Sequence, residues 1–161
     1  MNKEKISLIL LAIFLMTTVL TAASMFMDNT NGMVNETGSL NITDSKTKET
    51  RTVHYESKGK CLEVIDGDTI RVYGVGKVRL VQVDAPEKTS PDFTDSKKFV
   101  EEKCLGKTVY LDIDDAEPED KYGRHLAVVY TDTEDVNREL LNNGLAETLF
   151  IPPSEFPEGQ V

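Results

Sequence analysis

A mainly β protein with helices (α+β) is the fold class that this sequence predicts. Between residues 61 and 152, five short segments alternate polar and apolar side chains, as strands with one buried face do. Two segments with helical apolar spacing interrupt this series, one after the third strand and one after the fifth. Glycine, proline and aspartate cluster between the segments, as they do in turns.

The first three strands are expected to form a meander. Residues 62–65 end at Asp66-Gly67-Asp68, a turn sequence, and residues 69–73 then alternate apolar and polar side chains. A glycine-rich hairpin leads into the third strand, residues 77–83. A loop follows, because Pro86 has no backbone N–H and restricts the residue before it.

Two helices are expected after these strands. The first is capped by Thr94 or Asp95 and runs to about Leu105, where Gly106 ends it. The second is capped by Asp135 and stops at Gly144.

Residues 108–113 and 126–130 supply the fourth and fifth strands. Three strands, a helix and two strands, with a helix after them, are the order of a five-stranded OB-fold barrel. Side chains fill the interior of so small a barrel, so function is expected in loops at its rim. The domain predicted in this way spans residues 61–152.

Residues 1–27 are expected to be a signal peptide or an uncleaved membrane anchor. Lys3 and Lys5 precede a long uncharged, mostly apolar run, which would place the rest of the chain outside the cell, secreted or tethered to the outer face of the cytoplasmic membrane. Residues 28–60 contain few apolar side chains, so they are expected to be a flexible linker. The proline-rich residues 153–161 are expected to be a C-terminal tail.

The net charge of −10 excludes a protein that grips nucleic acid by a broad basic surface, so any site for a polyanion must be local. The two cysteines, Cys61 and Cys104, lie in the domain expected to be exported. Oxidising conditions favour a disulfide between them. Packing of both as free, small apolar thiols is the alternative.

Carboxylates gather at the ends of the apolar strands. Asp68 and Asp84 stand at the beginning and the end of one predicted hairpin, so they are expected to be neighbours in space. No cationic side chain is predicted between them, and hard oxygen ligands suit Ca²⁺ or Mg²⁺. Zinc is not expected, because the domain has one histidine and no clustered thiolates. Taken singly, each aspartate is more simply a turn residue.

Arg79 within the third strand and Arg124 before the fifth add cations to this end of the barrel. Singly, each is more simply a solvent-facing residue. Together with a metal and with Glu87, which is placed to position or deprotonate a water, they predict cleavage of phosphodiesters.

Four segments, VIDGDTI, VRLVQVDAPE, DKYGR and VNRELLNNGLAE, resemble in order and spacing the signature blocks of the thermonuclease (staphylococcal-nuclease-like) family. The resemblance covers residues 61–150. It implies a monomeric, Ca²⁺-dependent endonuclease that hydrolyses DNA and RNA phosphodiesters and leaves 3′-phosphates.

By this resemblance the catalytic residues are Arg79, Glu87 and Arg124. The Ca²⁺ ligands are Asp68, Asp84 and the backbone carbonyl of Ala85, with Asp66 behind them. Lys121 and Tyr122 would contact a neighbouring phosphate of the substrate.

Two features depart from the family pattern. The tyrosines that bracket the nucleotide base in the best-known member fall near Phe150 and Pro152 here, although Phe150 can still stack on a base. The usual C-terminal helix is replaced by a proline-rich segment. Two other classes of protein stay open: a catalytically silent OB module that binds nucleic acid or protein, and a cell-surface domain that binds calcium without chemistry.

Overall fold

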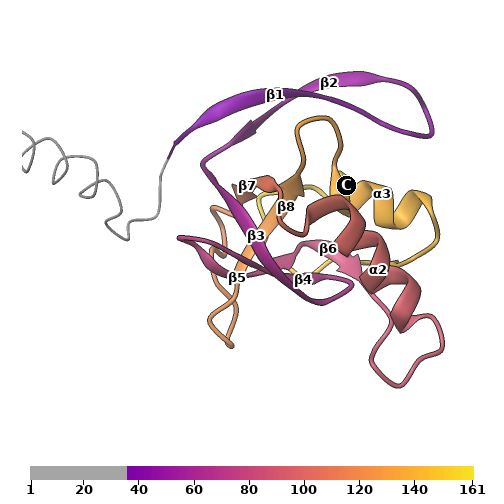
Figure 1. Ribbon diagram of the computed structural model, residues 1–161. Helices are drawn as coiled ribbons and strands as arrows, with labels where there is room; N and C mark the ends of the chain where they lie inside the picture. The colour runs from indigo at the N-terminus through magenta and orange to yellow at the C-terminus, as the bar shows by residue number, and fades with distance from the viewer. Residues whose placement is uncertain (1–35) are drawn as a thin grey trace, which may run out of the picture. The chain divides into compact units, whose positions relative to one another are not determined.

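Five strands close into a barrel in the computed structural model, which describes residues 36–161 (Figure 1). Around the barrel the order is β3, β4, β5, β8, β7, and neighbours are antiparallel except β5 and β8, which are parallel. The barrel strands are β3 (Ser57–Asp66), β4 (Thr69–Val72), β5 (Gly76–Leu80), β7 (Thr108–Ile113) and β8 (His125–Tyr130). Helix α2 (Phe93–Cys104) lies between β5 and β7 in sequence, and α3 (Val136–Asn142) follows β8. The predicted OB-type α+β barrel is confirmed.

The barrel interior is filled by small and medium apolar side chains from alternating strand positions, as the period-two patterns predicted. Its fully buried members are Ile70, Val72, Val78, Leu80, Val109, Leu111, Ala127 and Val129. Helix α2 covers part of this core with Val100 and Cys104. Its N-cap residue is Asp92, rather than the predicted Thr94 or Asp95, and the helix begins at Phe93.

The third strand of the prediction, residues 77–83, is interrupted. Gln82 has a φ of 58°, and the chain there leaves β5 and begins β6 (Gln82–Asp84), which pairs with β9 (Glu147–Leu149). The buried Gln82 amide donates hydrogen bonds to the carbonyls of Phe156 (2.9 Å) and Pro157 (2.8 Å). The bend therefore ties the barrel to the C-terminal segment.

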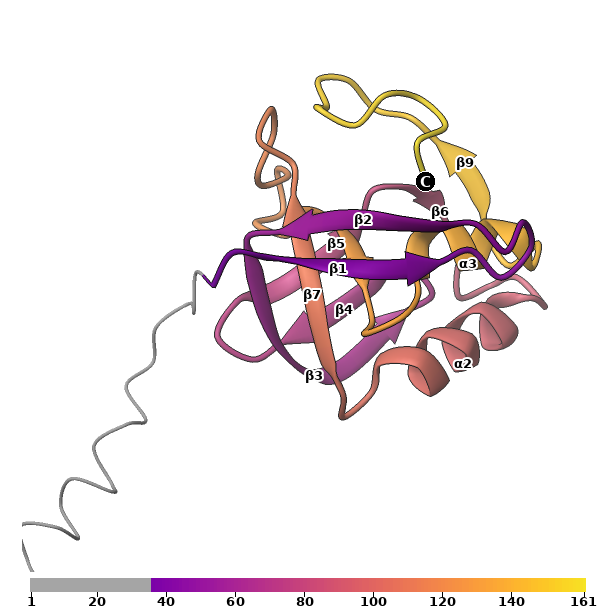
Figure 2. The same cartoon turned by 90° about the horizontal axis from the view of Figure 1, so that it is seen from above.

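A β-hairpin occupies much of the segment that was predicted to be a flexible linker. Residues 28–35 lie outside the described part of the chain, but strands β1 (Gly38–Thr43) and β2 (Thr50–Tyr55) pair along their whole length, and β3 begins at Ser57. The prediction is wrong for the paired residues because two apolar side chains, Ile42 and Val53, suffice to join the core cluster. Figures 1 and 2 show the hairpin lying along one side of the barrel.

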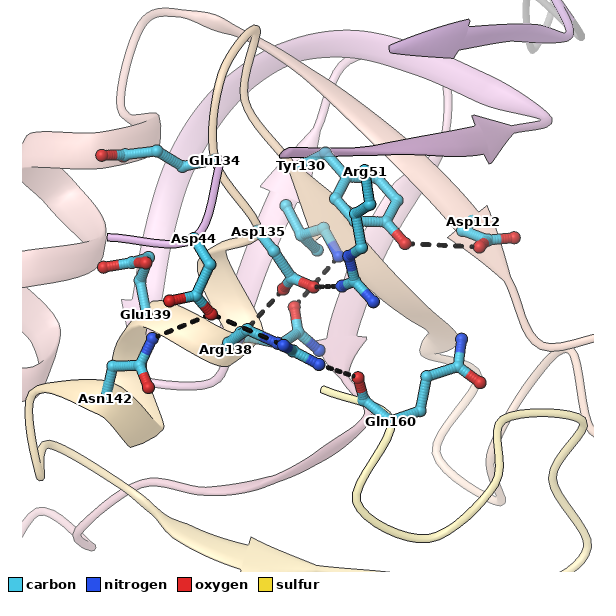
Figure 3. A network of polar contacts seen from close by, with 12 residues as sticks. Asp44, Arg51, Asp112, Tyr130, Glu134, Asp135, Arg138, Glu139, Asn142 and Gln160 are labelled. Atoms are coloured by element: carbon cyan, nitrogen blue, oxygen red, sulfur yellow. Dashed lines mark hydrogen bonds and ion pairs between the residues drawn. The ribbon is translucent and has the colours of Figure 1, made fainter. Parts of the chain in front are cut away.

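Helix α3 collects the polar contacts that hold the hairpin (Figure 3). From the β1–β2 turn, Asp44 lies 3.5 Å from Arg138 and accepts a hydrogen bond from Asn142 at 3.4 Å. The backbone N–H of Ser45 donates to Glu139 at 3.0 Å. The α3 cap, Asp135, accepts from the backbone N–H of Arg138 at 2.9 Å, as predicted for a cap.

Asp135 also pairs with Arg51 of β2 at 2.6 Å. The C-terminal segment joins the same network, since Arg138 donates to the carbonyl of Gln160. Phe156 and Val161 are buried in the core cluster, so residues 153–161 are packed rather than a free tail.

Both cysteines are free and buried, so the predicted Cys61–Cys104 disulfide is wrong. The two thiols belong to the hydrophobic cluster between β3 and α2, where each fills the place of a small apolar side chain. Burial raises the pKa of both, that of Cys104 to about 12, which keeps the thiols protonated and unreactive at neutral pH. Over residues 36–161, no helix has the length and apolar character needed to cross a membrane.

One buried side chain joins α3 to the barrel, which yields a stability prediction. Asn137 accepts from the N–H of Val129 (3.0 Å) and donates to the carbonyls of Val81 (2.8 Å) and Ala127 (3.4 Å). Asn137→Ala should lower the free energy of unfolding in urea by about 3 kcal/mol, because buried backbone groups lose their partners. Asn41→Ala, at an exposed position, is the control and should change it by less than about 0.5 kcal/mol. Equal effects of the two substitutions would contradict this role of Asn137.

Candidate active site

Two aspartates, one from the β3–β4 turn and one from β6, converge on one arginine. Asp68 stands just before β4, Asp84 ends β6, and Arg79 lies on β5 between them in sequence. Nη2 of Arg79 is 3.2 Å from Oδ2 of Asp68 and 3.4 Å from Oδ1 of Asp84. The carboxylates are therefore neighbours in space, as predicted.

The guanidinium of Arg79 is held on its other side by backbone. Nη1 donates to the carbonyls of Leu80 (2.5 Å) and Val83 (2.7 Å), and the side chain is only 13% exposed. The bend at Gln82 makes this possible, because it turns Val83 and Asp84 back toward β5. The expectation that no cationic side chain lies between the aspartates is wrong, since it did not include this bend.

Asp68 is the more enclosed of the two carboxylates, with an exposed fraction of 8% for the residue. It accepts hydrogen bonds from the N–H of Ala85 (2.9 Å) and the hydroxyl of Thr69 (3.0 Å). Burial raises its pKa to about 6, because desolvation outweighs the nearby charge of Arg79. One guanidinium thus compensates this buried charge incompletely.

Arg124 is positioned by a carboxylate that the sequence reasoning missed. Nε and Nη2 of Arg124 both lie 2.7 Å from Oδ2 of Asp120, and the backbone N–H groups of Tyr122 and Arg124 donate to Oδ1. Burial raises the pKa of Asp120, but these hydrogen bonds and the charge of Arg124 outweigh it and lower the pKa. The spacing of four residues in DKYGR was the available signal.

A hydroxyl relates the second arginine to the first pair of carboxylates. Nη1 of Arg124 lies 3.4 Å from the hydroxyl of Thr69, which in turn donates to Asp68. Thr69 is also the register partner of Arg79 across β4 and β5. The two arginines and Asp68 therefore meet at one point of the barrel surface.

A cavity of about 470 Å³ opens beside this point. Arg79, Lys121 and Arg124 supply its cations. Leu149 and Phe150 supply an apolar wall, so Phe150 faces the same cavity as the two arginines. The structure thus groups Lys121, Tyr122 and Phe150 with the two arginines.

Tyr122 is the most exposed aromatic residue of this group, at 70%. Nζ of Lys121 lies 5.0 Å from the centre of its ring, and the guanidinium carbon of Arg124 lies 5.4 Å from it. These cation–π contacts hold the ring near both cations at the mouth of the cavity.

Glu87 and Asp66 are placed less tightly. Glu87 is exposed on the loop after β6, and its carboxylate has no hydrogen bond or ion pair to any residue from 36 to 161. Asp66 accepts a 3.3 Å hydrogen bond from the N–H of Asp68 and shapes the turn between β3 and β4. The structure leaves Glu87 open to solvent and to a substrate.

Oxygen donors suitable for a hard cation are present, although few. Among residues 36–161 there is no cluster of three or more His, Cys, Asp or Glu side chains arranged to hold a metal. Asp68 and Asp84 nevertheless approach one cationic nitrogen within 3.4 Å, so their carboxylates fit a shared cation. Ala85 follows Asp84 and donates its backbone N–H to Asp68 at 2.9 Å, so its peptide lies beside the two carboxylates. Carboxylate oxygens are ligands that suit Ca²⁺.

The site thus combines a small OB-type barrel, two neighbouring carboxylates and two arginines held by ion pairs beside a cavity. Residues 77–160 match the staphylococcal nuclease homologue family, and the chain belongs to this family. The matched segment contains both arginines, Asp84, Glu87 and the whole cavity lining.

Individual relatives of the chain carry the names thermonuclease or endonuclease. The chain is 39% identical over 101 residues to a thermonuclease of Staphylococcus intermedius, covering 57% of this chain and 60% of the relative. It is 36% identical over 114 residues to endonuclease YncB of Bacillus subtilis (strain 168), covering 62% and 54%. A thermonuclease of Staphylococcus hyicus is 35% identical over 108 residues, covering 62% and 63%. The chain thus spans between half and two thirds of the length of these relatives.

The grip of Asp120 on Arg124 leads to a stability prediction. Asp120→Asn should lower the free energy of unfolding at pH 7 by about 1–2 kcal/mol, because a partly buried guanidinium loses its charged acceptor. The lowered pKa of Asp120 means that its contribution is complete above its ordinary pKa and is lost as the pH falls through the lowered value. The difference between variant and wild type should therefore shrink below about pH 4.

The matched control is Glu119→Gln, next to Asp120, whose carboxylate is 3.6 Å from His125 and largely exposed. It should change the unfolding free energy by less than about 0.5 kcal/mol. A difference between Asp120→Asn and wild type that stays constant from pH 7 to pH 3 would show that the carboxylate charge is not responsible.

Proposed function

We propose that the protein is a Ca²⁺-dependent nuclease that hydrolyses the phosphodiester bonds of DNA and RNA. The observation that carries this proposal is the convergence of Arg79, Arg124 and the Asp68–Asp84 pair beside one cavity. The family membership and the nuclease names of its relatives support it.

The arginines bind and orient the scissile phosphate. Each guanidinium offers planar N–H donors, which match phosphate oxygens and stabilise the charge that grows on them during hydrolysis. Asp120 fixes the direction of Arg124, so little side-chain freedom is lost when the phosphate binds. Arg79 gives its Nη2 hydrogens to the two aspartates when these hold no cation. When the aspartates hold a cation, Arg79 can donate these hydrogens to the phosphate instead.

Asp68, Asp84 and the carbonyl of Ala85 would hold the Ca²⁺. When bound, Ca²⁺ supplies positive charge to the phosphate and lowers the pKa of a nearby water. The raised pKa of Asp68, caused mainly by burial, indicates a carboxylate that gains from a second positive charge.

Glu87 has the role of positioning or deprotonating the attacking water. Its carboxylate is exposed and has no partner among the described side chains, so it is available to a water on the substrate side. The ring of Phe150, in the apolar wall of the cavity, would stack on a base. Stacking of this kind does not select a particular nucleotide sequence. Cleavage that leaves 3′-phosphates is proposed from the resemblance to the family.

We also propose that the protein is exported. The apolar run within residues 1–27, preceded by lysines, supports a secreted or membrane-tethered enzyme.

Chelation should abolish cleavage of plasmid DNA and of RNA, because the aspartates then have only Arg79 between them. Ca²⁺ should restore activity and Mg²⁺ should do so poorly, since its octahedral demand fits a loop-borne site badly. Independently of activity, Ca²⁺ should raise the Tm of the wild type but not that of Asp84→Asn. Undiminished cleavage in chelator, without a Ca²⁺-dependent Tm, would refute the metal assignment.

Glu87→Gln and Arg124→Lys should each lower kcat by a factor of about 10² or more, because they remove the water-positioning carboxylate and the planar phosphate fork. The exposed Glu102→Gln on α2 is the control and should keep full activity. Circular dichroism should show all three variants folded. A wild-type chain that binds an oligonucleotide in Ca²⁺ yet leaves it uncut would instead be a silent binding module.

A further inference from the structure

Away from the cavity, the barrel carries exposed apolar side chains interleaved with lysines. Leu62, Tyr73 and Leu105 are 49%, 49% and 46% exposed. The exposed lysines of the same surface are Lys60, Lys77 and Lys107. These six residues are called the lysine–leucine face below.

Backbone hydrogen bonds show that the face is continuous. The N–H of Tyr73 donates to the carbonyl of Lys60 at 2.8 Å. Cys61, between Lys60 and Leu62, donates to the carbonyl of Lys107 and accepts from Gly106, both at 2.9 Å. Because Cys61 points into the core, its two exposed neighbours point outward beside the 105–107 turn. Lys77 follows directly where β4 and β5 begin to pair at Val72 and Gly76.

The charge of this face contrasts with that of the whole chain, which is −10. Among residues 36–161, Lys60 and Lys77 have no ion pair, and Lys107 bonds only to the backbone carbonyl of Glu102 at 2.7 Å. Of the carboxylates that border the face, Glu63 is paired with Arg71 at 2.9 Å, and the exposed Glu102 is one negative charge beside three lysines. Positive charge is therefore locally in excess.

The face and the candidate active site lie at opposite ends of the β4–β5 ladder. Arg79 pairs in register with Thr69 at one end, and Val72 pairs with Gly76 at the other. Three residues of strand separate the two ends, about 10 Å. No residue of the face lines the cavity.

We propose that the lysine–leucine face docks on the surface of an anionic phospholipid bilayer. Lysines provide attraction to anionic head groups, while leucine and tyrosine side chains suit the boundary between head groups and acyl chains. Charge complementarity favours this partner, because the lysines of the face attract an anionic surface. The rest of the acidic domain would be repelled by that surface, so the face is the side that can approach it. A nucleic acid fits less well, since the face offers one aromatic ring and no unpaired arginine for stacking or phosphate recognition.

A fluorescent reporter can test this in the full chain. The sequence contains no tryptophan, so Tyr73→Trp and Tyr122→Trp each introduce a single one, on the face and at the cavity mouth respectively. Vesicles of phosphatidylglycerol and phosphatidylcholine with brominated acyl chains should quench and blue-shift the Tyr73→Trp emission, and leave that of Tyr122→Trp unchanged. Because the readout is local, membrane binding through residues 1–27 alone does not produce it. Equal quenching of both reporters, or of neither, would overturn the proposal.

Charge reversal gives the second measurement. In the Tyr73→Trp chain, Lys60→Glu with Lys77→Glu should raise the lipid concentration for half-maximal quenching at least about 25-fold, about fivefold per lysine. Lys46→Glu with Lys98→Glu changes the net charge equally at exposed lysines elsewhere, and should raise it less than about threefold. Equal shifts would mean that only net charge matters. Emission that responds to duplex DNA but not to vesicles would make the face a nucleic-acid surface and refute membrane docking.

Discussion

A single guanidinium, that of Arg79, organises the functional end of the barrel. It donates to two backbone carbonyls at the β5–β6 bend and faces two carboxylates, one from the β3–β4 turn and one from β6. Burying a carboxylate such as Asp68 without a positive charge nearby would cost several kcal/mol. Thus the arrangement that is proposed to bind a cation and a phosphate also makes its acidic residues tolerable in the folded state.

A second polar centre, around α3, supports the barrel from outside. Asn137 reaches into the barrel backbone, Asp135 holds the N-terminal hairpin through Arg51, and Arg138 reaches the C-terminal segment. A two-stranded hairpin and the proline-rich segment that replaces the family's usual terminal helix both contribute side chains to the core cluster. Their few buried apolar residues, such as Ile42, Val53 and Phe156, are held in place by these hydrogen bonds and ion pairs.

The sequence was sufficient for the features that depend on local periodicity. All five barrel strands, both helices and the cap at Asp135 follow from apolar spacing and capping chemistry. The bend at Gln82 was not predictable, because its partners are more than seventy residues away. The hairpin escaped for a similar reason: a sparse apolar pattern is stable only against a surface formed elsewhere in the chain. The two cysteines are buried as free thiols rather than joined in a disulfide. The sequence alone does not distinguish these two states, because the choice depends on three-dimensional packing.

The positions of the two terminal segments have a consequence for the order of folding. The hairpin turn meets α3 across 94 residues of sequence at Ser45 and Glu139, and Gln82 meets Phe156 across 74. Contacts of such long range carry a large loop-closure cost, and topologies that rely on them fold slowly. During synthesis, the hairpin cannot settle before α3 has been made, and the bend beside Arg79 cannot settle before Phe156 has been made. We therefore expect a nascent chain that remains unfolded until late, which is the state in which a polypeptide is most easily threaded through a narrow pore.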